Sequence, residues 1–334
     1  MVTHRALIAS VANTALEREL RARLRHVGDP SGPLDPLEKI AVQVGLIQGT
    51  PEPRFSTPRL FVFAADHGLA VDNITGNETR TTAVSVHCLV TEQLPLAALA
   101  RAQGLSMMVV DSGIAELVEP HEHLQARKIA HGTRNSRVGK AMTIEQVQAA
   151  IRAGLEIGES LNGNAVACAG VGVGSGQSAA LVLASLSNVP VREFVDVGPA
   201  PSDGLRDHTI RVLESAHQRH IDLIDPIEVL AALGGFEVAM MVGLMLSAAA
   251  RRFVIILDGL PACAALLVAS TLAPSVVEYC VLTRSNRLTG LDRALSLFPS
   301  NAVLEVNAEA IDGTGASLTW PLISTAAALL SAIH

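Results

Sequence analysis

The sequence contains few aromatic residues, few charged residues and few cysteines, and each shortage excludes a class of protein. Only 3% of its 334 residues are aromatic and 17% are charged, whereas 49% are hydrophobic, which excludes a disordered chain and favours a large buried core. The four cysteines are scattered, and no two stand at the spacing of a metal-ligand pair or a redox motif. We therefore expect reduced thiols, a cytoplasmic location and no metal site.

Blocks of positive charge and long uninterrupted apolar runs are also missing. The net charge is −7 and Lys and Arg are not clustered, so nucleic acid is not an expected partner. Charges interrupt residues 1–26 before a signal-like apolar segment develops. The most apolar stretch, Phe253–Ser270, contains Asp258 and Pro261, and the final run, Trp320–Ile333, is too short to span a bilayer. We expect no membrane association.

The sequence does contain an alternation of short apolar runs with longer periodic segments rich in Ala and Leu. This alternation is typical of parallel strands joined by helical crossovers. It predicts an α/β fold, with a doubly wound, mostly parallel, Rossmann-like sheet and helices on both faces. The expected strands are Leu60–Ala65, Met107–Asp111, Ala165–Gly170, Phe253–Asp258 and Val277–Leu282. The expected helices are 5–26, 35–48, 79–103, 143–161, 177–187, 205–220, 226–251 with a break at Gly234-Gly235, 261–272 and 315–332.

The pattern also divides the chain into two regions. The first 50 residues are predicted to be helical and precede the first strand, and the proline-rich stretch from Thr50 to Pro58 is typical of a linker. We expect residues 1–50, with part of the C-terminal helix, to form a small helical subdomain. Residues 51–334 would then form the α/β domain.

Acidic residues and glycines stand where predicted strands stop. These residues are Asp66, Asp111, Gly170 and Asp258. Open α/β sheets bind ligands at the carboxyl ends of their strands, so this edge is the expected site. Asp66 leads through His67 into a polar loop that can hold a ligand, although an Asp at a strand end is as often a turn or cap residue. His67 has no second metal ligand at a suitable spacing.

A glycine-rich turn, Gly170–Gly176, follows the third predicted strand and opens a helix. Backbone N–H groups at such a turn can bind a phosphate or a carboxylate. The turn also suggests a dinucleotide-dependent oxidoreductase, but Asp196 follows it without a clear strand–helix–strand register. Close packing of the strand against the helix is a third interpretation.

Two further acids stand beside glycines. Glu237 begins an apolar helix directly after Gly234-Gly235, where the helix dipole stabilises a carboxylate. Asp312 lies in a glycine-rich loop ahead of a long apolar helix, and it can accept a proton or simply cap that helix. For each acid taken alone, the cap role is the favoured interpretation.

Together these segments resemble the nicotinate-nucleotide:dimethylbenzimidazole phosphoribosyltransferase family over most of the chain. The matching segments are Ala65-Asp66-His67-Gly68, Thr82, Val109-Val110-Asp111-Ser112-Gly113, Gly132-Thr133 with Asn135, Ala141-Met142-Thr143, Leu233-Gly234-Gly235-Phe236-Glu237, Leu257-Asp258-Gly259 and Gly313-Thr314-Gly315-Ala316. The resemblance implies a parallel α/β sheet with a small helical domain. It also implies a homodimer with active sites near the interface. The sequence leaves a heterodimer with a sister chain open as the alternative.

The resemblance also implies a reaction. In that family an azole nitrogen attacks the ribose C1 of nicotinate mononucleotide, releases nicotinate and inverts the anomeric carbon, which gives the lower-ligand nucleotide of cobalamin-type cofactors. A glutamate deprotonates the attacking base, and Asp312, one methylene shorter, is the matching residue. We expect an azole or phenolic base as the acceptor and no cofactor. The expected substrate-binding residues are Asp66, His67, Gly68, Thr75, Thr82, Gly172, Gly174, Ser175, Gly176, Asp258, Ser285, Gly313, Thr314 and Gly315, with Gly174, Ser175 and Gly176 on the phosphate side.

The sequence departs from the family pattern around the phosphate and the base. Gly170 stands where the family has a glutamate, and Ser175-Gly176-Gln177 replaces an Asn-Thr-Thr run. Thr209 aligns near a family lysine, and Glu309 aligns with a family arginine. These departures suggest an alternative function, a non-catalytic paralogue that binds a nucleotide or serves as a partner subunit.

Overall fold

A six-stranded sheet organises the fold, with its strands in the order β3-β2-β1-β4-β5-β6 and every pairing parallel. The structure is a computed structural model, and it describes residues 8–27, 35–75, 80–195, 203–284, 289–300, 302–305 and 311–331. The strands are β1 (Arg59–Ala65), β2 (Ser106–Gly113), β3 (Leu124–Ala126), β4 (Ala165–Val171), β5 (Val254–Leu257) and β6 (Cys280–Leu282). The order reverses between β1 and β4, which confirms the predicted doubly wound parallel sheet.

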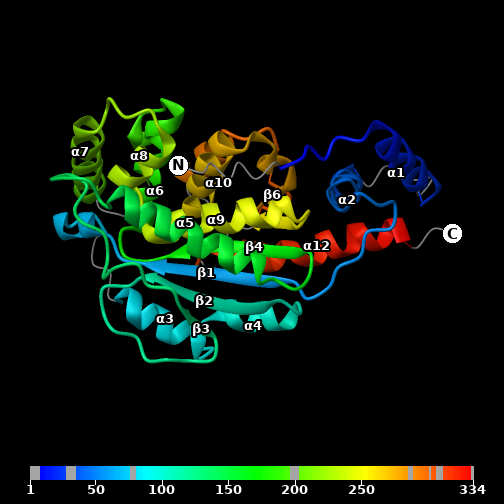
Figure 1. Ribbon diagram of the computed structural model, residues 1–334, viewed down its shortest axis with the longest axis horizontal. Helices are drawn as coiled ribbons and strands as arrows, with labels where there is room; N and C mark the ends of the chain where they lie inside the picture. The colour runs from blue at the N-terminus through cyan, green and yellow to red at the C-terminus, as the bar shows by residue number, and fades with distance from the viewer. Residues whose placement is uncertain are drawn as a thin grey trace.

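The helices account for most of the remaining chain (Figure 1). They are α1 (Thr14–Val27), α2 (Asp35–Gln48), α3 (Thr82–Val90), α4 (Pro95–Ala102), α5 (Ile144–Glu159), α6 (Ser175–Ser187), α7 (Asp203–Arg219), α8 (Pro226–Leu233), α9 (Phe236–Ala250), α10 (Leu260–Leu272), α11 (Thr289–Leu295) and α12 (Thr314–Ser331). Three 3-10 helices, η1 (Gly68–Asp72), η2 (Val191–Glu193) and η3 (Pro274–Tyr279), complete the described elements.

The centre of the sheet is covered on both faces, which explains its continuous apolar strands. Every residue of β1 after Arg59 is buried, as are Ala165–Gly170 of β4. Helix α9, itself almost entirely buried, packs on β1, β2, β4 and β5. Helices α3 and α4 lie on the opposite side of the sheet from α9 (Figure 1). The ends of the central strands are therefore positioned by packing on both faces of the sheet.

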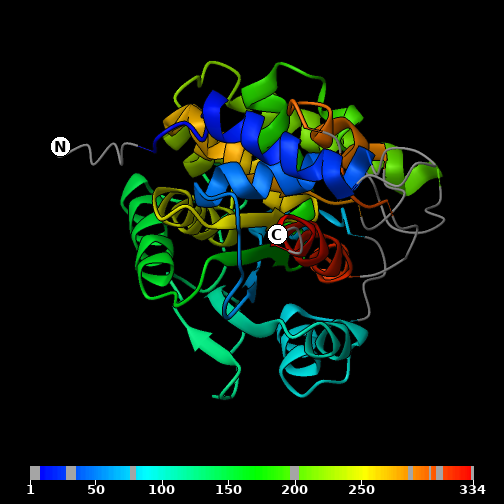
Figure 2. The same ribbon diagram turned by 90° about the vertical axis from the view of Figure 1, so that its right-hand side faces the viewer.

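The N-terminal and C-terminal helices pack together. Helices α1, α2 and α12 contact one another, and Figure 2 shows α12 beside these N-terminal helices. Leu20 of α1 and Ile47 of α2 are fully buried, so this group adds to the main core. The helical subdomain of residues 1–50, with part of the C-terminal helix, and its division from the α/β domain stay predictions.

Several predicted elements differ from the structure at their boundaries. The single helix expected over 79–103 is two helices, because the chain turns at Thr91–Leu94 and Pro95 starts α4. The stretch Thr82–Ala102 is long and apolar enough to suggest a membrane span by composition, but neither of its two helices exceeds nine residues. The strand expected over 277–282 is shortened to β6, since η3 occupies residues 274–279.

The contact between α5 and α9 generates a stability prediction. Gly154 and Gly158 of α5 and Gly243 of α9 let these helices approach, and a Cβ on Gly154 would lie 1.9 Å from the carbonyl oxygen of Met240. Gly154→Ala should therefore lower the free energy of unfolding by about 1–3 kcal/mol through overpacking. Urea denaturation measures this, with the helical Gly204→Ala as the control, because a Cβ there meets nothing and should be neutral or stabilising. Equal stability of both variants would contradict the close packing.

Candidate functional site

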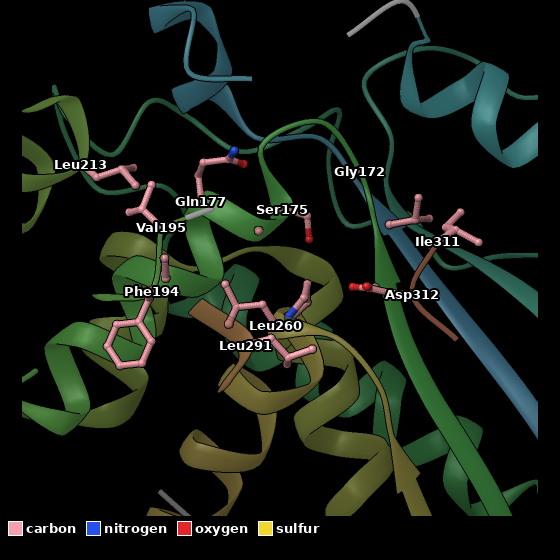
Figure 3. Close-up of a pocket in the computed structure, with 15 residues that line it drawn as sticks. Gly172, Ser175, Gln177, Phe194, Val195, Leu213, Leu260, Leu291, Ile311 and Asp312 are labelled. Carbon is pink, nitrogen blue, oxygen red and sulfur yellow. The ribbon is translucent and has the colours of Figure 1, made fainter. Parts of the chain in front are cut away.

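The candidate site lies where β4 and β5 end, on the edge that the sequence predicts. A pocket of about 300 Å³ opens between the end of β4, the start of α6, the start of α10 and the segment before α12. Four of the predicted site residues line it: Gly172, Ser175, Gly176 and Asp312. Figure 3 shows Ser175 and Asp312 among the side chains around this pocket. The structure thus joins segments that are about 140 residues apart in the chain.

The wall of the pocket is largely apolar. Its hydrophobic side chains are Val171, Phe194, Val195, Leu213, Leu260, Pro261, Leu291 and Ile311. Asp312 is the one charged side chain among the described residues of the lining, and Gln177 supplies an amide (Figure 3). A pocket of this kind suits a flat, mostly apolar ring whose orientation is fixed by a few polar groups.

The turn between β4 and α6 requires glycine. At Gly172 a Cβ would lie 1.7 Å from the carbonyl oxygen of Ala65, so no larger residue fits between the ends of β1 and β4. Gly174 has a φ of 84° and precedes Ser175, the first residue of α6. The Ser175 N–H donates to the Gly172 carbonyl at 3.1 Å, whereas the N–H groups of Gly176 and Gln177, also in the first turn of α6, have no partners within the helix and can bind an anion.

Asp258 fixes the segment that carries Asp312. Its carboxylate is buried after β5, and Oδ2 accepts hydrogen bonds from the backbone N–H groups of Gly313 and Gly315, each at 2.8 Å. Its Oδ1 accepts a hydrogen bond from the Thr283 hydroxyl at 3.0 Å. These contacts place the start of α12 against the end of β5. Substrate contact by Asp258, Gly313 and Gly315 stays a prediction.

Asp312 is held in a confined position beside Asp258. It packs so closely on Gly259 that a Cβ on this glycine would lie 2.0 Å from Oδ2 of Asp312. Burial, followed by the negative charge of Asp258, raises the pKa of Asp312 well above its ordinary value. A carboxyl whose pKa is raised is a stronger proton acceptor when ionised, so Asp312 is suited to general-base chemistry.

Asp66 and Thr82 form a second polar group, at the end of β1. The Thr82 hydroxyl donates to Oδ1 of Asp66, while Oδ2 accepts a hydrogen bond from the backbone N–H of Ala115 at 2.7 Å. The Thr82 hydroxyl also accepts a hydrogen bond from the Val173 N–H at 2.9 Å. These contacts hold the Gly172–Gly174 turn in place through the N–H of Val173. Neither Asp66 nor Thr82 lines the pocket, and their binding roles stay predictions.

His67, Ser175 and Glu237 meet in a buried group directly behind the pocket wall. Oε1 of Glu237 accepts a hydrogen bond from Nε2 of His67 and another from Oγ of Ser175, both at 2.8 Å. Glu237 is fully buried, and its Oε2 has no hydrogen-bond partner. An unsatisfied buried acceptor costs about 1–3 kcal/mol, so its presence beside a pocket suggests a functional constraint.

The remaining predicted residues lie around this region. Gly68 donates its N–H to the Thr133 hydroxyl at 3.3 Å, and Thr314 donates its hydroxyl to the Ile311 carbonyl at 2.7 Å. Thr75 is half-buried after η1, and Ser285 lies outside the described residues, as does Glu309. Thr209 is buried and donates to the Ile74 carbonyl at 3.2 Å, four residues before Leu213 in the pocket wall.

Sequence reasoning missed the His67–Glu237–Ser175 group and the apolar pocket wall. The signal for Glu237 was present, because it is the one acid in the buried run from Val229 to Ala249. Such a charge needs partners, and its sequence neighbours offer none. The sequence gives no comparable signal for the pocket wall. Its apolar residues, such as Phe194 and Leu291, look like ordinary core residues, and only the folded chain brings them to the pocket. Within the described ranges, no three His, Cys, Asp or Glu residues gather to hold a metal ion.

Comparisons with known proteins show the family and the fold of the chain. The sequence pattern of a family described as phosphoribosyltransferase matches residues 9–334. The nicotinate-nucleotide–dimethylbenzimidazole phosphoribosyltransferase of Cupriavidus necator is 37% identical over 95% of this chain and 92% of its own length. The enzyme of the same name from Janthinobacterium sp. is 33% identical over 96% of this chain and 93% of its own. The crystal structure of CobT from Thermus thermophilus superimposes with a TM-score of 0.89 at 26% identity, covering 95% of this chain and 96% of that chain.

The raised pKa of Asp312 generates a pH-dependent stability prediction. Between the ordinary pKa of 3.8 and the higher pKa in the folded protein, the native state holds more protons than the unfolded state. The contribution of Asp312 to stability is therefore lost as the pH rises through this interval. Asp312→Asn lacks the ionisation, so its stability relative to wild type should increase as the pH rises above about 4. Urea denaturation across a pH series measures the difference, and a difference that does not change with pH would contradict the prediction.

Proposed function

Because the chain belongs to the nicotinate-nucleotide:dimethylbenzimidazole phosphoribosyltransferase family, we propose that it transfers the phosphoribosyl group of nicotinate mononucleotide to an azole base such as dimethylbenzimidazole. The product would be an α-riboside phosphate that provides the lower-ligand nucleotide of a cobalamin-type cofactor. The observation that carries this proposal is the carboxyl of Asp312 in the wall of an apolar pocket beside the first turn of α6. The free thiols of all four cysteines support the predicted cytoplasmic location.

The pocket suggests how the two substrates are arranged. The phosphate of the mononucleotide would bind the N–H groups at the start of α6, where Gly176 lines the pocket and leaves the backbone accessible. The apolar wall would hold the ring of the leaving nicotinate or the attacking base. Ring stacking and exclusion of water by this wall would fix the reacting atoms near Asp312.

The chemistry assigned to Asp312 follows from its position. The azole nitrogen forms a bond to the ribose C1 while the bond from C1 to the nicotinate nitrogen breaks, and nicotinate leaves with the electron pair. The azole then carries a surplus proton on its second nitrogen, which the carboxylate of Asp312 accepts. The raised pKa of Asp312 makes its ionised carboxylate a stronger proton acceptor than an ordinary aspartate.

Asp312→Asn tests the role of the general base. The substitution keeps size and polarity but removes basicity, so turnover of nicotinate mononucleotide with dimethylbenzimidazole should fall by about 10²–10⁴-fold. Mononucleotide affinity should stay nearly unchanged, because the phosphate contacts are on α6. A product assay measures the first quantity, and calorimetry measures the second.

Asp312→Glu is the matched control for that experiment. It retains a carboxylate, and it should keep more turnover than Asp312→Asn even though the tight contact with Gly259 penalises the longer side chain. Equal turnover of wild type and Asp312→Asn would show that Asp312 is not the base. If wild type turns over no azole or phenol, the non-catalytic paralogue becomes the better description.

We further propose that the protein is a homodimer and that exposed apolar residues near the site form part of its interface. Val71, Val138, Ile221 and Ile224 are large hydrophobic residues that are between 48% and 90% exposed. Their segments are joined, because Arg137 pairs with Asp72 and His220 bonds to the Ser136 carbonyl. Such exposed apolar residues are typical of an interaction surface.

Sedimentation tests the dimer. At micromolar concentration we expect about 70 kDa, twice the chain mass of 34.9 kDa. Ile224→Glu should shift the protein towards the monomer, whereas Leu117→Glu, also exposed but in the loop after β2, serves as the comparison variant. A wild-type monomer would contradict the homodimer and favour pairing with a sister chain.

A further inference from the structure

The hydroxyl of Ser175 is oriented by a buried carboxylate. Ser175 lines the pocket, yet its Oγ donates a hydrogen bond to Oε1 of Glu237, which is fully buried at the start of α9. A serine hydroxyl has a single proton, and an ionised carboxylate can only accept hydrogen bonds. While this bond is in place, Ser175 has no proton to offer to the pocket.

The surroundings of Glu237 keep this orientation in place. His67 is the other side chain that donates to Oε1, and Oε2 has no partner. A buried carboxylate is stabilised by each donor it has, so releasing Ser175 would leave Glu237 with His67 alone. The Ser175 Oγ therefore presents its lone pairs to the pocket.

We infer that Ser175 Oγ accepts a hydrogen bond from a ribose hydroxyl of the mononucleotide, and that Glu237 is the positioning residue that makes Ser175 an acceptor. This inference rests on the proposed function. Phosphate oxygens only accept hydrogen bonds, so they cannot pair with an oxygen that presents lone pairs. The phosphate would therefore bind the N–H groups of the first turn of α6. The secondary hydroxyls of ribose can donate a hydrogen bond to Ser175 Oγ.

The inference is tested with nicotinate mononucleotide and its 2′-deoxy and 3′-deoxy forms as probes, by calorimetry. Wild type should bind the ribose compound about two- to tenfold more tightly than one of the two deoxy compounds, the range for one neutral hydrogen bond. In Ser175→Ala that preference should disappear. In Glu237→Gln it should weaken, because the amide can donate to Ser175 and release its proton.

Ser178→Ala is the matched control. Ser178 lies on the same helix and its hydroxyl donates to the Leu233 carbonyl at 2.7 Å, so it anchors α6 to the segment that leads into α9, outside the pocket lining. Its loss should leave the ribose preference as in wild type. The readout is the ratio of the affinities for the ribose and deoxy compounds within one variant. If Ser175 had a merely structural role, its loss would loosen the helix and weaken both affinities alike, and this ratio would not change.

Three results would overturn the inference. The first is a wild type that binds all three compounds equally. This result needs no variant, so it overturns the inference even if Ser175→Ala fails to fold. An unchanged preference in Ser175→Ala would also exclude Ser175 as the acceptor while leaving the proposed function intact. A wild type that binds none of the compounds would contradict the proposed function together with the inference.

Discussion

The hydrogen bonds from the Gly313 and Gly315 backbone to the buried carboxylate of Asp258 determine where Asp312 stands. Asp258 follows β5, which pairs with β4 and β6, and Gly313 lies in the turn into α12, so the two bonds connect distant parts of the chain at one point. Without these two hydrogen bonds, the distance between Asp312, the proposed base, and the pocket wall would not be fixed. Catalysis by a positioned group depends on such fixed geometry.

The same arrangement gives Asp312 its chemical character. A carboxylate that anchors a backbone loop must be close to the loop, and its charge therefore acts on any acid that the loop carries. Asp258 together with burial raises the pKa of Asp312, which favours proton transfer from an azole at the expense of stability at neutral pH. The carboxyl of Asp258 thus both positions the loop and raises the pKa of Asp312, the proposed base.

The sequence was sufficient to predict the sheet and the edge at which the site lies. Continuous apolar runs gave β1, β2 and β4 within two residues at either end, because central parallel strands must be buried on both faces. The short edge strand β3 escaped prediction, since two half-buried residues and one exposed residue have no clear pattern. Asp312 and the glycines of the turn before α6 were predictable from their motifs. The partnership of Glu237 with Ser175 was not, because it depends on how α6 and α9 pack.

The most direct measurement is a crystal structure with nicotinate mononucleotide bound. The account predicts the phosphate at the first turn of α6, the ribose hydroxyls towards Ser175, and the ribose C1 facing Asp312 across the apolar pocket. A mononucleotide bound elsewhere, or in this pocket with its phosphate against Asp312, would contradict the central claim that Asp312 serves as the base.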